Sequence, residues 1–235
     1  TGILFDSRLD IVDTRGGEPR TVVRAGWLRG HSWLPDGSGL GLVKELCRAN
    51  PKASIVVLTG FANIATAIEA IKLGADALSI HVNVGNGSDQ EMLSDLGRVS
   101  REAREWGMPL LAMMYPRGEK IKDEYDPQVI MHVSRLGAEL GADLVKVSYT
   151  GSVESFRQVV VGCPVPVVIA GGPKMSSDRD ILEMVQGSIE AGGAGVSIGR
   201  NVFQHRDPSR MVGAISMIVN ENSGVDEALT FLQAR

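Results

Sequence analysis

The stretch Leu140-Gly-Ala-Asp-Leu-Val-Lys-Val-Ser148 predicts both the fold of this chain and the place of its chemistry. Leu144, Val145 and Val147 favour a strand, and the glycine before them is typical of the residue that ends a helix. An apolar run bounded in this way indicates a buried strand of a parallel sheet. This strand carries one charged residue, Lys146, which we therefore expect to point into a core or a pocket.

A lysine on such a strand is a candidate nucleophile. Burial removes water from the ammonium group and lowers its pKa, so a fraction of free amine is present near neutral pH and can attack a carbonyl carbon. Lys146 is therefore a candidate for Schiff-base formation. The alternative, from this strand alone, is a lysine that extends from the strand end toward water.

The unit of helix end, glycine and apolar strand occurs three times, at residues 73–81, 140–148 and 191–199. Two further strands, Pro109–Tyr115 and Val165–Ala170, fit between these units. Such alternation indicates a β/α architecture with a parallel sheet. Helical spacing of apolar residues predicts the intervening helices at Glu91–Glu105, Pro127–Leu140, Glu154–Val160 and Asp178–Ala191.

The strand count favours a closed barrel. Five strands begin at or after Leu78, and at most three more precede it, among Ile3–Phe5, Leu9–Val12, Thr21–Val23 and Ser54–Leu58. About eight strands is the number of a (β/α)8 TIM-like barrel, which we expect to form one domain over residues 1–235. An open, doubly wound sheet is the alternative if the first third of the chain supplies fewer strands.

The composition favours a small-molecule ligand. The 235 residues are 43% apolar and 22% charged, with a net charge of −4, so no broad basic field is present for nucleic acid or an anionic membrane. Cys47 and Cys163 lack metal-ligand spacing, which suits free thiols in the cytoplasm. We expect no membrane span, no metal and no cofactor, since a protonated imine is itself an electron sink.

Polar residues and glycines gather where the predicted strands end, which is where barrels place their chemistry. Two glycine-bearing turns after the last two strands match the usual place for a phosphate held by backbone N–H groups. A Gly-Gly-Pro sequence taken alone is more often only a turn. The candidate site residues are His81, Tyr115, Arg117, Lys146, Gly171, Gly172, Gly199 and Arg200.

Residues 75–235 resemble the archaeal-type class I aldolase family, which includes fructose-1,6-bisphosphate aldolase and, as the closer likeness, 2-amino-3,7-dideoxy-D-threo-hept-6-ulosonate synthase. The resemblance implies that Lys146 forms the Schiff base, that Tyr115 is the acid/base, and that Gly171, Gly172, Gly199 and Arg200 bind the sugar phosphate. The motifs that carry it are Ser79-Ile-His-Val-Asn-Val-Gly85, Met113-Met-Tyr-Pro-Arg-Gly118, Val145-Lys-Val-Ser-Tyr-Thr-Gly151, Ala170-Gly-Gly-Pro-Lys174 and Ile198-Gly-Arg-Asn-Val-Phe-Gln-His205.

The same resemblance implies a phosphorylated ketose or inorganic phosphate as the ligand, with His81 and Arg117 in the substrate site. It also implies a homo-oligomer and a place in aromatic amino acid biosynthesis.

The N-terminal third departs from this family. Residues 34–77 resemble part of a response-regulator receiver domain, although His31 stands where the phosphoacceptor aspartate is expected. The aldolase family's first strand ends in Asp-His-Gly, which this chain lacks; Asp6 is the nearest substitute. We therefore expect a chimera with first strands of unlike origin and reduced activity. The alternative is a catalytically inactive fusion that keeps only phosphate binding.

Overall fold

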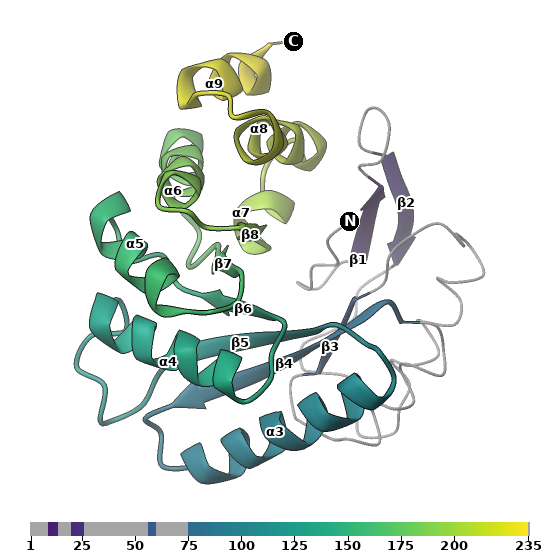
Figure 1. Ribbon diagram of the computed structural model, residues 1–235. Coiled ribbons are helices and arrows are strands. Elements are labelled where there is room, and N and C mark those ends of the chain that lie inside the picture. Colours follow the sequence, from purple (N-terminus) through teal and green to yellow (C-terminus); the bar gives the residue numbers. More distant parts are fainter. Residues whose placement is uncertain (1–8, 14–19, 26–55, 60–74, 235) are drawn as a thin grey trace.

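One parallel sheet organises the computed structural model, which describes residues 9–13, 20–25, 56–59 and 75–234 (Figure 1). Its six strands pair in chain order from β3 to β8, as expected for repeated β/α units. The strands are β3 (Val56–Thr59), β4 (Ala77–Val84), β5 (Leu110–Pro116), β6 (Leu144–Val147), β7 (Val167–Ala170) and β8 (Gly195–Ser197). The predicted α/β class with a parallel sheet is thus confirmed.

Two strands near the N-terminus do not join this sheet. Strands β1 (Leu9–Asp13) and β2 (Arg20–Ala25) are antiparallel and form a two-stranded sheet of their own. Within the described segments, β3 and β8 are therefore the edge strands, and closure into an eight-stranded barrel is not seen. The prediction that these stretches supply parallel barrel strands is corrected here, because they pair with each other across a short connection.

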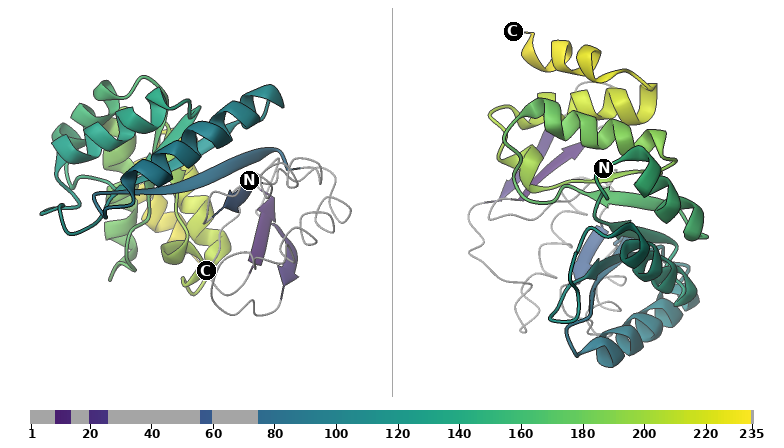
Figure 2. Two further views of the ribbon diagram at one scale, coloured as in Figure 1. Left: turned by 90° about the horizontal axis from the view of Figure 1, so that it is seen from below. Right: turned by 90° about the vertical axis from the view of Figure 1, so that its left-hand side faces the viewer.

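Helices alternate with the strands at the predicted places, with boundaries shifted by a few residues at most. In the views of Figures 1 and 2 the helices follow one another along the sheet as a curved layer that ends at the C-terminus. These helices are α3 (Asp89–Glu105), α4 (Pro127–Glu139), α5 (Val153–Gly162) and α6 (Asp178–Glu190). After β8 the chain adds the short α7 (Arg200–Phe203) and two helices that the sequence analysis did not predict, α8 (Pro208–Glu221) and α9 (Val225–Gln233).

Several helices begin at a residue that caps their free N–H groups. The Asp126 carboxylate accepts hydrogen bonds from Gln128 N and Val129 N at the start of α4, and Pro127 occupies the first helical position. Ser152 and Ser177 cap α5 and α6 in the same way. These caps fix where each helix starts relative to the strand before it.

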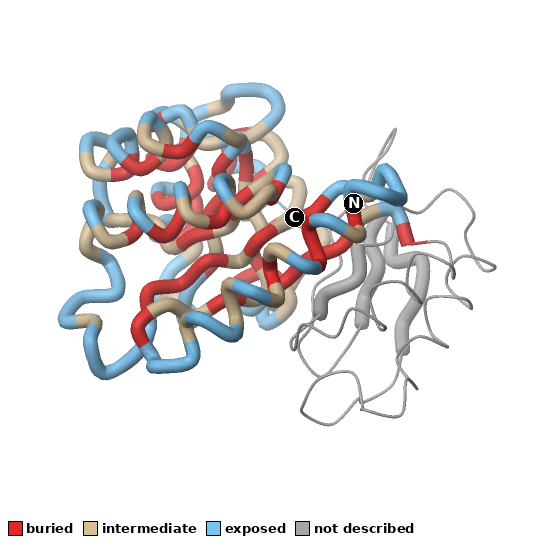
Figure 3. The backbone as a smooth tube through the Cα atoms, turned by 60° about the horizontal axis from the view of Figure 1, so that its bottom comes forward, coloured by how far each residue is buried: buried red, intermediate tan, exposed pale blue. Residues whose placement is uncertain are grey.

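The core lies between the sheet and this helix layer, where the buried residues concentrate (Figure 3). Helix α4 approaches β5 and β6 closely because it has a glycine at the contact: a Cβ at Gly137 would lie 2.8 Å from Met114 Cγ and 3.4 Å from Val145 Cγ2. Met114, Val145 and Val147 are all fully buried. Since side chains alternate along a strand, Met113, Tyr115 and Lys146 belong to the opposite face of the sheet.

The joint between α4 and β6 contains the sequence from which the fold was predicted. Asp143 binds the start of β5 twice, because Leu110 N donates to its carboxylate at 2.9 Å and its own N–H donates to Leu110 O at 3.0 Å. The Gly-Ala-Asp sequence thus ends a helix and sets the register of β6 against β5. The corresponding helix before Gly74 and the rest of the receiver-like stretch 34–77, apart from β3 and residues 75–77, lie outside the described residues, as do Ile3–Phe5 and Asp6.

Candidate active site

Lys146 lies in the middle of the sheet, on the face that the helices do not cover. Its strand β6 is paired on both sides, and Lys146 is in register with Met113 of β5 and Val168 of β7. Its side chain is half-buried, and burial lowers its pKa from 10.5 to about 8. About one Lys146 in ten is then a free amine at pH 7, against roughly one in three thousand at the unshifted pKa.

Tyr115 stands two residues beyond Met113 on the neighbouring strand. The spacings of a parallel sheet place its Cα roughly 8 Å from that of Lys146, on the same face. The side chain is 8% exposed, and burial raises the pKa of its phenol to about 12, against a smaller opposing effect of Arg117. Tyr115 therefore keeps its proton at neutral pH and can donate it to a reacting oxygen.

His81 and Asn83 of β4 complete this side of the site. Asn83 is in register with Tyr115, and His81 with Met113. The His81 ring meets the Tyr115 ring edge to face, with centroids 5.2 Å apart, and its Nε2 lies 2.9 Å from Asn83 Oδ1. Burial lowers the pKa of His81; the Asn83 contact opposes this, and the charges of Arg117 and Lys146 add to it. Together these effects favour the neutral imidazole.

Arg117 follows β5 and covers Tyr115. Its guanidinium carbon lies 4.6 Å from the centre of the tyrosine ring, and its Nε is 3.4 Å from Glu124 Oε2. Both charged side chains are about half exposed, so this ion pair contributes little to stability.

The glycine turns lie at the same edge of the sheet, after β7 and β8. Gly171 follows three residues after Val168, the strand partner of Lys146. Gly171 has no room for a side chain, because a Cβ there would lie 2.6 Å from Ile198 Cγ2. Gly172 is exposed, and Gly199 precedes the first turn of α7, where Arg200 is also exposed. The two turns are therefore in contact and open to solvent.

The structure thus brings His81, Tyr115 and Lys146 together on three adjacent strands, and places both glycine turns at the same end of the next two. Sequence reasoning missed Asn83 and Asn201, which are hydrogen-bonded members of this region. Both stand within the quoted motifs. An asparagine among apolar strand or helix residues is the signal that could have singled them out.

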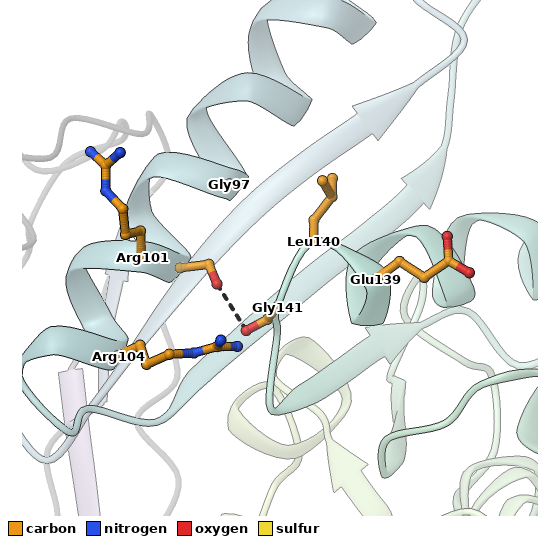
Figure 4. A pocket seen from close by; sticks show the side chains of 7 residues that line it. Gly97, Arg101, Arg104, Glu139, Leu140 and Gly141 are labelled. Carbon is orange, nitrogen blue, oxygen red and sulfur yellow. Dashed lines mark hydrogen bonds between the residues drawn. The ribbon is translucent and has the colours of Figure 1, made fainter.

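A pocket lies at the opposite ends of the strands, between α3 and α4 (Figure 4). Ser100 Oγ donates a hydrogen bond to Gly141 O at 3.0 Å, and Arg101, Arg104 and Glu139 border the opening. No candidate residue from the sequence analysis lies there. Its one buried polar side chain, Ser100, is already paired with Gly141 O, so the pocket offers no free buried polar group.

Within the described segments, no three or more His, Cys, Asp and Glu side chains are grouped so as to hold a metal ion. Cys163 is a buried free thiol, as predicted, and Cys47 lies outside the described residues. None of the described helices combines the length and apolar character needed to cross a bilayer.

Comparison with known proteins identifies the family. The family model described as DeoC/LacD family aldolase matches residues 45–205, well over half of the chain. The chain belongs to this family. The match confirms the aldolase resemblance, whereas the receiver-like likeness and the chimera find no support: the family model starts inside the stretch 34–77 and runs on through β3.

Two curated relatives of this DeoC/LacD family member are synthases. The 2-amino-4,5-dihydroxy-6-oxo-7-(phosphonooxy)heptanoate synthase of Streptomyces griseus is 44% identical over 156 residues, which cover 66% of this chain and 57% of that protein. The 2-amino-3,7-dideoxy-D-threo-hept-6-ulosonate synthase 1 of Archaeoglobus fulgidus is 44% identical over 169 residues, which cover 72% and 62%. The chain thus matches only about three fifths of the length of these relatives.

A solved archaeal fructose-1,6-bisphosphate aldolase is also similar to this family member. Its catalytic lysine is covalently bound to the carbinolamine intermediate of its substrate. The two structures align with a TM-score of 0.63 and 37% identity over 65% of this chain and 61% of the aldolase. Nothing in these comparisons supports the reduced activity expected from the absent Asp-His-Gly.

Proposed function

We propose that this chain carries the active centre of a class I aldolase that acts on a phosphorylated ketose, in the manner of 2-amino-3,7-dideoxy-D-threo-hept-6-ulosonate synthase. The observation that carries the proposal is the position of Lys146: a lysine with a pKa of about 8, in the middle of a parallel sheet, one strand away from a buried protonated tyrosine. We also propose that the parallel sheet is part of a (β/α)8 barrel around this lysine.

The first steps of the reaction follow from these two side chains. The free amine of Lys146 attacks the ketose carbonyl carbon, and a proton passes from the amine nitrogen to the carbonyl oxygen to give a carbinolamine. Tyr115 donates its proton to the carbinolamine hydroxyl, which leaves as water, and the nitrogen becomes a protonated imine. The Tyr115 phenolate then takes the proton of the substrate hydroxyl as the adjacent carbon–carbon bond breaks; the imine accepts the electron pair of that bond, so no metal is needed for this step.

The phosphate of the ketose is assigned to the two glycine turns. Backbone N–H groups of Gly171, Gly172 and Gly199 have no side chain in the way of an anion, and the exposed Arg200 supplies a positive charge. His81 and Arg117 lie on the other side of Lys146, where the remaining hydroxyl and anionic groups of the reactants are proposed to bind.

The pH profile of imine trapping tests this proposal. With dihydroxyacetone phosphate and cyanoborohydride, the rate of covalent trapping should rise about 50-fold from pH 6 to pH 8 and level off above about pH 9, because the fraction of free amine follows a pKa of about 8. Intact-mass spectrometry measures the reduced adduct. A rate that still rises tenfold between pH 9 and pH 10 would mean that the reacting lysine is an ordinary exposed one.

The phosphate site has its own test. Inorganic phosphate should raise the melting temperature of the protein, since a ligand that binds only the folded state stabilises it. Arg200→Ala should reduce this shift by more than half without changing the melting temperature in phosphate-free buffer, because the side chain is exposed. Arg98→Ala, at an exposed arginine of α3, is the matched control and should respond to phosphate as the parent does.

A further inference from the structure

Asn201 is a buried polar side chain at the junction of the two glycine turns. It lies in the first turn of α7, directly after Gly199 and Arg200, and is only 3% exposed. A buried amide is costly unless its donors and acceptor are all paired. The partners of this amide therefore indicate what it does.

Every hydrogen bond found for the Asn201 side chain goes to the backbone of the other turn. Its Nδ2 donates to Gly171 O at 2.6 Å and to Pro173 O at 3.0 Å. Its Oδ1 accepts from Met175 N at 2.8 Å. The Asn201 side chain, from the turn after β8, thus hydrogen-bonds to the backbone of three alternate residues in the turn after β7.

These bonds also orient backbone N–H groups of the turn, including that of Gly172, which the proposed function assigns to phosphate. A trans peptide is planar, with its C=O and N–H pointing in opposite directions. When Asn201 holds Gly171 O, the N–H of Gly172, which belongs to the same peptide, points away from the asparagine. The bond to Pro173 O fixes the N–H of Lys174 in the same manner. Another hydrogen bond between the segments after β7 and β8 runs from the exposed Lys174 Nζ to Gln204 O, at 3.4 Å.

We infer that Asn201 is a positioning residue, which aligns the N–H groups of Gly172 and Lys174 with Gly199 and Arg200 for one phosphate; this inference rests on the proposed function. Asn201 touches no substrate in this account. It acts through the backbone that it holds, so its loss should weaken the binding of phosphorylated ligands and leave the reactivity of Lys146 unchanged.

The test compares Asn201→Ala with the parent and with Asn220→Ala, which removes an exposed asparagine of α8 that donates only to Ser216 Oγ. The concentration of inorganic phosphate that gives half of the maximal melting shift should rise at least tenfold in Asn201→Ala, because charge-assisted hydrogen bonds lose their alignment. It should be unchanged in Asn220→Ala. Asn201→Ser keeps one short hydrogen-bond donor, so its half-maximal phosphate concentration should rise less. This variant replaces Asn201→Ala in the test if the alanine variant does not fold.

Imine trapping separates this inference from the proposed function. In Asn201→Ala, the dihydroxyacetone phosphate concentration for half-maximal trapping should rise at least tenfold, whereas trapping of unphosphorylated dihydroxyacetone should keep the parent rate. Equal losses with both ketones would overturn the positioning role, and so would a phosphate shift identical to that of the parent. If the parent is trapped by neither ketone, the aldolase proposal is refuted, and the phosphate titration still decides the role of Asn201. If phosphate does not shift the melting temperature of the parent, the role of Asn201 is refuted as well.

Discussion

Tyr115→Phe is expected to slow imine formation at Lys146 by a factor of about 10² to 10⁴, the usual contribution of a positioned general acid. The phenol is the protonated group beside the lysine, and burial keeps its pKa near 12, so it is a donor throughout the neutral range. Phenylalanine fills the same space and keeps the contacts with His81 and Arg117. The time course of trapping with dihydroxyacetone phosphate and cyanoborohydride measures the loss.

Tyr125→Phe is the matched control for this variant. Tyr125 is 47% exposed, in the loop before α4, and its hydroxyl has no role in the account. The Tyr125→Phe variant should be trapped at the same rate as the parent. If Tyr115→Phe also reacts at the parent rate, the proton comes from another group, and Tyr115 is only part of the packing around His81.

Gly118→Ala is expected to destabilise the fold by about 3 kcal/mol or more. Gly118 has φ of 147°, a conformation that residues with a side chain rarely adopt, and a Cβ there would overlap the carbonyl group of Gly85. This contact joins the loop after β4, the strand that carries His81 and Asn83, to the loop after β5, which carries Arg117. Because backbone lies on both sides, neither loop can give way by a change of rotamer. Urea unfolding measures the change in free energy.

Gly87→Ala separates the cost of the positive φ from the cost of the steric overlap. Gly87 also has a positive φ, of 90°, but a Cβ there would meet nothing within 4 Å. Its cost should therefore be the conformational part alone, about 1 kcal/mol. Equal losses in the two variants would show that the approach of Gly118 to Gly85 is unimportant, and that these loops are held by other contacts.

The part of the fold that could be predicted is the part whose signals are local. The helices α3 to α6 are amphipathic, and α4 to α6 begin at capping residues, so their positions follow from the sequence within a few residues. The strand that carries Lys146 follows from its apolar run and the preceding glycine. The strands near residues 9–13 and 20–25 were also predicted. Their antiparallel pairing was not predicted, because a run of β-forming residues does not indicate which strand it pairs with.

In the candidate site, too, the residues with a local sequence signal could be predicted and the others could not. Lys146 is conspicuous in the sequence because a charged residue is rare in a buried strand, and Tyr115 because it ends a predicted strand within a family motif; the two lie on adjacent strands of the sheet. Asn201 is not conspicuous: its three hydrogen bonds cross about 28 residues of sequence, and only the approach of β7 and β8 brings those partners together. Long-range pairing of this kind has no local signature.

The most direct test of the central claim is to map the lysine that is reduced when the full chain reacts with dihydroxyacetone phosphate and cyanoborohydride. Peptide mass spectrometry should place the adduct on Lys146 alone, and Lys146→Met should abolish it. Lys174, an exposed lysine in the turn after β7, is the internal control, since its amine is not desolvated. An adduct on Lys174, or one that survives in Lys146→Met, would contradict the assignment of Lys146 as the Schiff-base residue.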